Sequence, residues 1–326
     1  MFLSILKKNN FCIFIFFLVG MTSCRSTFCP DQELIEIPCH WSTPLSCGMT
    51  EEDVSGYPWW EALNDPLLTE LIEQAICRND DVRLAAAQST EKELEAINTV
   101  AAETAKSYIE LRGLQTRLEI LQANQEAQSQ LVAINQGLSN KGFFSSIDQN
   151  ENQKNLDSLQ SQASAIELSI RKTIFHLSTL LSYPPGSLYD TLYQHQEPPE
   201  LPNDIPVGTP AESILCHPTV REAKKAYAMT RSREAFYQYR KAVLNVFEAA
   251  ENALAAFLYE REKFYYVNNS ARLKAESYQL TKNLSDQGLK DDRDVLMMYQ
   301  EFLSEEDALI QSKINLLNIY VDLYHN

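Results

Sequence analysis

A glycine followed six residues later by an aspartate occurs twice in this 326-residue chain, and 146 positions separate the two copies. Gly142 precedes Asp148, Gly288 precedes Asp294, and long helical patterns lie on both sides of each pair. Glycine tolerates the positive φ that ends a helix, and aspartate accepts hydrogen bonds from the free N–H groups that begin the next one. The two copies therefore predict two long helical hairpins related by an internal repeat.

The hydrophobic pattern around these turns is helical. Between Asn79 and Asn140 strong helix breakers are few, Gly113 among them, and after each turn apolar residues recur at spacings of three, four or seven. A sustained period near 3.5 makes helices supercoil around partners, so we expect an all-α fold of long antiparallel coiled-coil hairpins. The periodicity is equally compatible with a soluble antiparallel coiled coil.

The N-terminus has the features of a secretory signal. Lys7 and Lys8 precede an apolar run over 11–21, which is too short to span a bilayer. The run ends in a segment that resembles a bacterial lipobox, in which the signal is cut before a cysteine that becomes lipid-modified, here Cys24. The alternative is an ordinary cleaved signal with an incidental cysteine. In lipoproteins that stay at the inner membrane, an aspartate follows the lipidated cysteine, whereas this chain has Arg25. We therefore expect the protein to be located at the periplasmic face of the outer membrane.

Changes in composition suggest five segments. Prolines are concentrated between the two helical halves, where they favour an extended, loop-like connection. We expect a signal peptide at 1–23, a lipidated tether at 24–56, a first helical repeat at 57–182, a Pro-rich linker at 183–217 and a second helical repeat at 218–326.

Charge and motifs argue against several functions. The formal net charge of −16 disfavours a nucleic-acid partner, because phosphate binding needs a basic stripe. The five histidines are scattered, and the sequence contains no HExxH, GxSxG or Walker A motif, so we expect no catalytic residue and no cofactor. No CxxC occurs, so no metal site is expected either. Disulfide pairing remains open among Cys29, Cys39, Cys47, Cys77 and Cys216.

Five segments of the chain match, in order, the motifs of one protein family. They are an opening tryptophan and Asp-Pro-x-Leu motif at 59–68, the rest of the first helix at 71–85, a linker at 201–208, a motif similar to Arg-Pro-Asp-Val-Arg-x-Ala at 217–223, with His217 and Thr219 departing from it, and a helix leading to the second turn at 246–254. With these motifs the chain resembles the TolC/OprM-type outer-membrane efflux proteins, particularly their lipoprotein branch.

The resemblance implies a trimeric tube with a periplasmic α-barrel, which works with a periplasmic adaptor and an inner-membrane pump. It also implies that the Gly142 and Gly288 turns lie at the closed periplasmic tip. Asp148 and Asp294 would then lie near the constriction, where carboxylates in the family set a cation-selective gate. Both aspartates also suit a purely structural role as helix caps, and the two roles can coexist.

The chain departs from the family at two matching points of the repeat. The family places a pair of membrane strands after the first helix and another after the motif at 217–223, whereas this sequence shows no segment of alternating polarity at either point. We therefore expect the β-barrel strands to be absent. Three positions before each glycine, where the family often has an aromatic or basic residue, the chain has Ser139 and Ser285.

Two hypotheses about function follow from this resemblance and these departures. The first is a TolC-family lipoprotein that acts as the periplasmic duct component of a tripartite efflux or secretion system. The alternative is a barrel-less periplasmic coiled-coil lipoprotein with a structural or scaffolding role and no transport activity.

Overall fold

The computed structural model describes residues 36–46, 48–52, 58–139 and 146–325. Four long helices dominate this part of the chain: α3 (Thr90–Ser139), α4 (Ser146–Leu180), α8 (Arg233–Asp286) and α9 (Asp292–His325). The shorter elements are a 3-10 turn (Glu61–Leu63), α1 (Pro66–Arg78), α2 (Asp80–Ala86), α5 (Tyr189–Leu192), α6 (Pro210–Cys216) and α7 (Pro218–Thr230). The predicted all-α fold with long helical hairpins is confirmed.

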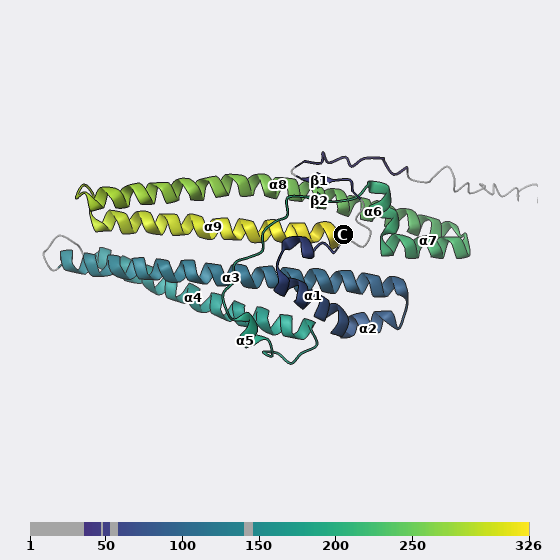
Figure 1. Ribbon diagram of the computed structural model, residues 1–326, viewed down its shortest axis with the longest axis horizontal. Helices are drawn as coiled ribbons and strands as arrows, with labels where there is room; N and C mark the ends of the chain where they lie inside the picture. Colours follow the sequence, from purple (N-terminus) through teal and green to yellow (C-terminus); the bar gives the residue numbers. More distant parts are fainter. Residues whose placement is uncertain (1–35, 47, 53–57, 140–145, 326) are drawn as a thin grey trace, which may run out of the picture.

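The long helices lie side by side in the order α8, α9, α3, α4 (Figure 1). Within each hairpin the second helix runs back along the first, and the two hairpins meet along α3 and α9. At 1.5 Å per residue, the 54 residues of α8 extend roughly 80 Å. The molecule is therefore long and narrow, with α8 and α4 at its two outer edges.

Polar side chains join α3 to α9 along their contact. Arg117 Nε donates to Asp307 Oδ1 at 2.6 Å, and Lys106 forms an ion pair with Asp322. Nearer the α8–α9 turn, the Gln300 amide donates to Asn124 Oδ1 at 2.9 Å. These bonds link residues far apart in the sequence, so they fix how the two hairpins are aligned.

The main hydrophobic core is formed by residues of the 3-10 turn, α1, α3, α4 and α9. Trp59 stacks on Tyr324 with ring centroids 5.9 Å apart, and the Tyr320 hydroxyl donates to the Trp59 carbonyl at 2.9 Å. Leu63 and Tyr108 are also fully buried there. The tryptophan motif at the start of the first repeat is thus held by the last turns of α9.

Two helix junctions show that the internal repeat extends to backbone detail. Asn79, between α1 and α2, has φ −57° and ψ 131°, and His217, between α6 and α7, has φ −60° and ψ 132°. Each side chain accepts a hydrogen bond from the backbone N–H two residues later, from Asp81 at 2.8 Å and from Thr219 at 3.3 Å. His217 therefore departs from the family motif but still caps its helix through Nδ1.

Extended structure in the described residues is short. Strand β1 (Met49–Thr50) pairs in parallel with β2 (Ile205–Pro206), with Met49 opposite Ile205. At the two points where family strands were expected to be missing, brief junctions at 87–89 and 231–232 join α2 to α3 and α7 to α8. The expected helical passage through both points is confirmed. No helix in the described part of the chain combines the length and apolar character needed to cross a membrane.

Candidate functional site

The α8–α9 turn has the geometry of a glycine-terminated helix. Gly288 has φ +74°. Its N–H donates to the Ser285 carbonyl at 2.8 Å, and the next N–H, of Leu289, donates to the Leu284 carbonyl at 2.9 Å. This pair of bonds is the Schellman motif, which requires the left-handed conformation that glycine adopts without strain. The prediction that Gly288 ends the helix is confirmed.

The predicted capping role of Asp294 is wrong. Helix α9 begins at Asp292, and the carboxylate of Asp291 accepts the Asp294 N–H at 2.8 Å. Asp291 is therefore the N-cap, and Asp294 lies inside the first turn, where its carboxylate pairs with Lys290 at 3.0 Å. Three aspartates within four residues all suit a cap, and only the backbone path selects Asp291.

The first turn is described only in part. Gly142 lies outside the described residues, as does Cys24, the predicted lipidation site. Helix α4 begins at Ser146, so the backbone of Asp148 is already helical. The capping role of Asp148 stays a prediction.

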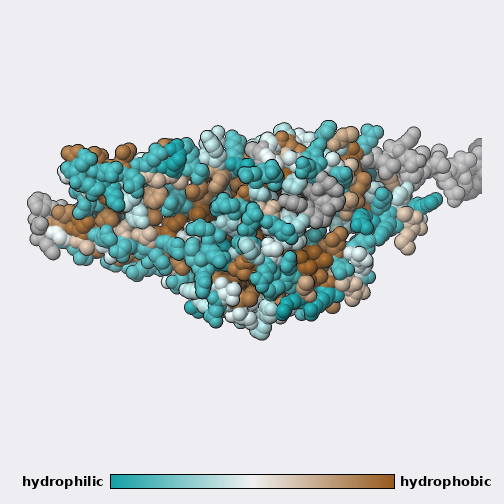
Figure 2. Space-filling view, viewed as in Figure 1, coloured by the Kyte–Doolittle hydropathy of each residue, from teal (hydrophilic) through white to brown (hydrophobic). Residues whose placement is uncertain are grey.

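The outer edge of α8 carries a stripe of exposed apolar side chains. Tyr259, Tyr266, Leu273 and Leu280 follow each other at seven-residue spacing and keep between 48% and 74% of their surface exposed. Seven residues are nearly two helical turns, so these side chains lie on one face. Figure 2 shows hydrophobic residues at the surface near the C-terminal end of α8, beside the α8–α9 turn. We call these four residues the α8 stripe.

The opposite edge of the molecule is also apolar in part. On α4, Leu168 and Phe175 are 53% and 41% exposed and again lie seven residues apart. A solvated helix would have polar residues on its outer face. Both edges of the four-helix arrangement therefore have the spacing of a coiled-coil seam, and these side chains stay exposed within the described chain, although the four-residue α5 also contacts α4.

A buried arginine fastens the linker to α3, and sequence reasoning missed it. Arg112 is fully buried, and its Nη1 donates to the carbonyl of Gln194 at 2.8 Å and to Gln115 Oε1 at 2.7 Å. Gln115 in turn donates to the Leu192 carbonyl at 2.8 Å. A charged residue directly between Leu111 and Gly113 was the available signal.

Tyr108 extends this polar contact toward α1. Its hydroxyl donates to Asp65 Oδ2 at 2.7 Å, and the Arg112 guanidinium lies 4.8 Å from its ring centroid. Burial, and then the bond to the Asp65 carboxylate, raise the pKa of Tyr108 well above its usual range. The tyrosine therefore stays protonated and acts as a donor, which gives it a structural role.

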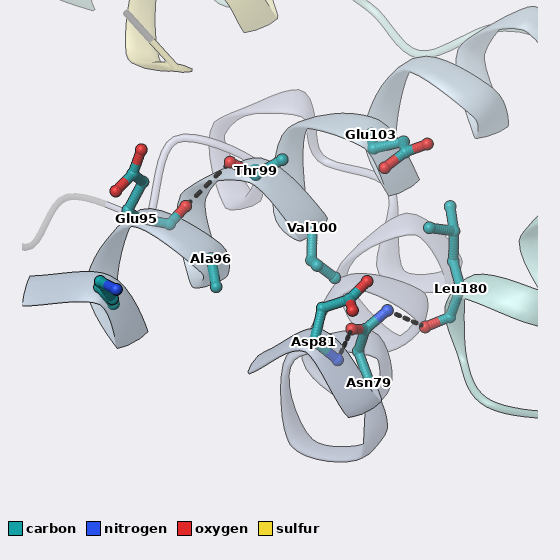
Figure 3. Close-up of a pocket in the computed structure, with 9 residues that line it drawn as sticks. Asn79, Asp81, Glu95, Ala96, Thr99, Val100, Glu103 and Leu180 are labelled. Carbon is teal, nitrogen blue, oxygen red and sulfur yellow. Dashed lines mark hydrogen bonds between the residues drawn. The ribbon is translucent and has the colours of Figure 1, made fainter. Parts of the chain in front are cut away.

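A hollow of about 350 Å³ lies between the α1–α2 junction, the start of α3 and the end of α4 (Figure 3). Its acidic lining residues are Asp81, Glu95 and Glu103. The Asn79 side chain beside it is already hydrogen-bonded within the molecule, since its amide donates to the Leu180 carbonyl at 2.9 Å. Glu103 pairs with His176 at 3.2 Å. Thr99, the hydroxyl-bearing residue of the lining, donates to the Glu95 carbonyl at 2.9 Å.

Neither metal binding nor disulfide formation is supported in the described residues. No group of three or more His, Cys, Asp or Glu side chains there is placed to hold a metal ion. Cys39, Cys77 and Cys216 are exposed free thiols. The candidate functional features are therefore the two apolar edges and the turn at the end of the hairpin.

Comparison with known proteins identifies the fold. No protein-family model matches the sequence. The nodulation protein T of Rhizobium leguminosarum bv. trifolii is 23% identical over 248 residues, which cover 54% of this chain and 53% of the relative. The chain thus spans about half the length of the curated relative it matches.

Solved structures give a broader match. The outer-membrane channel OprN superposes with a TM-score of 0.69 at 16% identity, covering 91% of this chain and 98% of that one. CusC, described in connection with transmembrane channel formation, gives 0.67 at 13%, covering 80% and 97%. The Campylobacter jejuni outer-membrane channel CmeC gives 0.64 at 15%, covering 82% and 87%. The chain has the helical fold of TolC/OprM-type channels.

Proposed function

From this shared fold, we propose that the chain is the helical duct component of an outer-membrane efflux or secretion system. The observation that carries the proposal is the pair of apolar edges, on α8 and on α4, at opposite sides of four long helices. Two different edges on one molecule form a head-to-tail contact between copies, and such a contact gives a ring when the rotation between successive copies closes. A ring of parallel helical hairpins encloses a passage along their length.

Three copies is the number that the resemblance to the channel family implies. In the proposed trimer, the α8 stripe of one copy packs against Leu168 and Phe175 of the next. The α8–α9 turn lies at one end of this tube, where the Asp291, Asp292 and Asp294 carboxylates surround the opening and favour cations. A periplasmic adaptor and an inner-membrane pump supply the cargo and the energy. The signal peptide at 1–23 and a lipid at Cys24 place the duct at the outer membrane.

Site-directed photocrosslinking tests the ring. A photoreactive phenylalanine analogue at Tyr266 is expected to give covalent species of two and three copies in cells, and the product is expected to map to α4. The same analogue at Leu84, which is exposed on α2 away from both edges, is the matched control. Only uncrosslinked chain from position 266, or equal products from both positions, would contradict the proposed ring.

A deletion strain tests transport itself. We expect it to become sensitive to exported toxic compounds, with resistance restored by the native chain but not by Tyr266→Asp/Leu273→Asp, which places charges in the α8 stripe. Normal resistance in the deletion strain, together with intact crosslinked trimers, would leave the scaffolding role.

Cys24→Ser tests the anchor, because loss of the lipid should release the protein from membranes on alkaline carbonate washing.

A further inference from the structure

At the end of the molecule opposite the α8–α9 turn, a short helical hairpin is basic. Residues 218–241, which form α7 and the first turns of α8, contain seven Lys and Arg but only two Glu, in a chain whose net charge is −16. The turn of this short hairpin, at 231–232, lies at the right-hand extremity of the helices in Figure 1. Six of the seven basic side chains are exposed. We call residues 218–241 the basic hairpin.

Only part of this positive charge is neutralised within the molecule. Glu91, at the start of α3, forms an ion pair with Lys225 and lies 4.0 Å from Arg221. Lys224, Arg231 and Lys241 form no ion pair with any described residue. A cluster of cations without carboxylate partners, in an otherwise acidic protein, indicates an anionic surface as its partner.

The basic hairpin also exposes apolar and aromatic side chains. Met229, in the last turn of α7, is 86% exposed. On α8, Arg233 and Lys241 lie four residues to either side of Tyr237, and the Arg233 guanidinium is 5.7 Å from the tyrosine ring centroid. Basic residues mixed with exposed apolar and aromatic ones are typical of helices that bind at the membrane interface. A nucleic-acid partner would not account for Met229 at the extremity.

The N-terminal segment approaches this same end. Ile37 packs against Ile214, Val220 and Val243 at the base of the basic hairpin. Eleven residues lie between Cys24 and Glu36, and the twelve steps from one Cα to the next span at most about 40 Å. The 13 residues of α7 extend about 20 Å beyond that base. Cys24 can therefore reach the plane in which the turn of the hairpin lies.

We propose that the basic hairpin docks on an anionic phospholipid surface and provides a membrane contact separate from any lipid on Cys24. Lys224 and Arg231 lie against the headgroup phosphates, and Met229 enters the boundary with the acyl chains. This contact orients the long helices away from the bilayer, with the α8–α9 turn at the far end. It requires neither ring formation nor transport, so it goes beyond the proposed function.

Vesicle flotation of the mature chain carrying Cys24→Ser tests this contact without a lipid anchor. We expect binding to phosphatidylcholine vesicles that also contain phosphatidylglycerol, no binding to phosphatidylcholine alone, and weaker binding at high salt. Lys224→Gln/Arg231→Gln should lower partitioning about 30-fold, since each basic residue near an anionic surface contributes about a factor of five. Met229→Ser should weaken binding further at any salt concentration.

The matched control is Lys282→Gln/Lys290→Gln, which makes the same change in net charge at the opposite end, and circular dichroism checks that all variants are folded. Unchanged vesicle binding by this control supports the proposal. Absence of phosphatidylglycerol-dependent binding by the parent protein overturns it, and so does equal weakening by both double variants. Self-association that is lost only in the Lys224→Gln/Arg231→Gln variant, without vesicle binding, would instead make the basic hairpin a contact between copies. The crosslinking result at Tyr266 is independent of all these outcomes.

Discussion

Two glycines of α3 illustrate how the surroundings of one residue decide its role. A Cβ added to Gly113 would lie 1.9 Å from Ile314 Cδ1 and 2.5 Å from Ile314 Cγ1, whereas a Cβ on Gly137 would meet nothing within 4 Å. The residue type of Gly113 suggests a helix break, but the helix α3 continues through it. Gly113 allows α9 to approach α3 closely at the contact between the two hairpins.

This difference predicts opposite effects of one substitution in the same helix. Gly137→Ala should stabilise the protein by about 0.5–1 kcal/mol through helix propensity. Gly113→Ala should destabilise it by about 1 kcal/mol, because overpacking of roughly 1–3 kcal/mol exceeds that gain. Chemical denaturation of the two variants provides the comparison, and in an Ile314→Ala background the Gly113→Ala change should no longer be destabilising. Equal stabilisation by both alanines would contradict the close α3–α9 contact.

At the scale of the element, the ends of the long helices depend on backbone geometry that residue types do not specify. Asp291, Asp292 and Asp294 are chemically equivalent, but only Asp291 precedes the helix and faces a free N–H group. Asp292 instead receives a weak bond from Ser285 at 3.4 Å, and Asp294 pairs with Lys290. The cap and the ion pair are thus separate interactions within one turn.

We expect Asp291→Ala to loosen the start of α9 by about 1 kcal/mol, the usual value of an N-cap. Asp294→Ala should cost less, because it removes an exposed ion pair of about 0.5 kcal/mol or below. Hydrogen exchange of the amides in the first turn of α9 measures both effects. A larger loss of protection in Asp294→Ala than in Asp291→Ala would show that Asp294, and not Asp291, is the N-cap of α9.

Across the whole molecule, one carboxylate fastens the N-terminal segment to α8. Glu251 accepts the backbone N–H groups of Ser42 at 2.6 Å and Thr43 at 3.0 Å, together with the Thr43 hydroxyl at 2.7 Å. Burial raises the pKa of Glu251, but these hydrogen bonds outweigh it and hold the pKa below the usual value of 4.5. The segment that leads to the predicted lipid anchor is therefore attached by an ionised group.

Because the pKa is lower in the folded state, this attachment is fully present above pH 4.5 and is lost as the pH falls through the folded-state pKa. Hydrogen exchange at residues 41–43 should therefore accelerate in acid relative to intrinsic rates. Glu251→Gln should show weaker protection at neutral pH and no such acid dependence. Glu248→Gln, an exposed change one turn earlier in α8, is the control. Identical pH profiles for both variants would exclude Glu251 as the attachment.

Much of this architecture was predictable from residue order. The long helices and the helix-ending role of Gly288 are local properties, because each depends on residues within one or two helical turns. The repeat is recognised by comparing two such local patterns. The capping role of Asp294 was predicted wrongly, since a shift of a few residues in the start of a helix moves the cap to a neighbour. The link from Arg112 to the 192–194 carbonyls could not be predicted, because it joins α3 to a linker about 80 positions away.

The amino-acid sequence by itself determined that the chain forms two antiparallel helical hairpins, because backbone hydrogen bonding and hydrophobic spacing act over short distances. Heptad spacing creates an apolar seam on a helix but does not specify which other helix packs against it. The order α8, α9, α3, α4 arose from packing between distant residues, such as Ile314 against Gly113 and Asp307 against Arg117. That tertiary arrangement buries the seams of α3 and α9 and leaves those of α8 and α4 exposed, which makes the outer edges available to neighbouring copies.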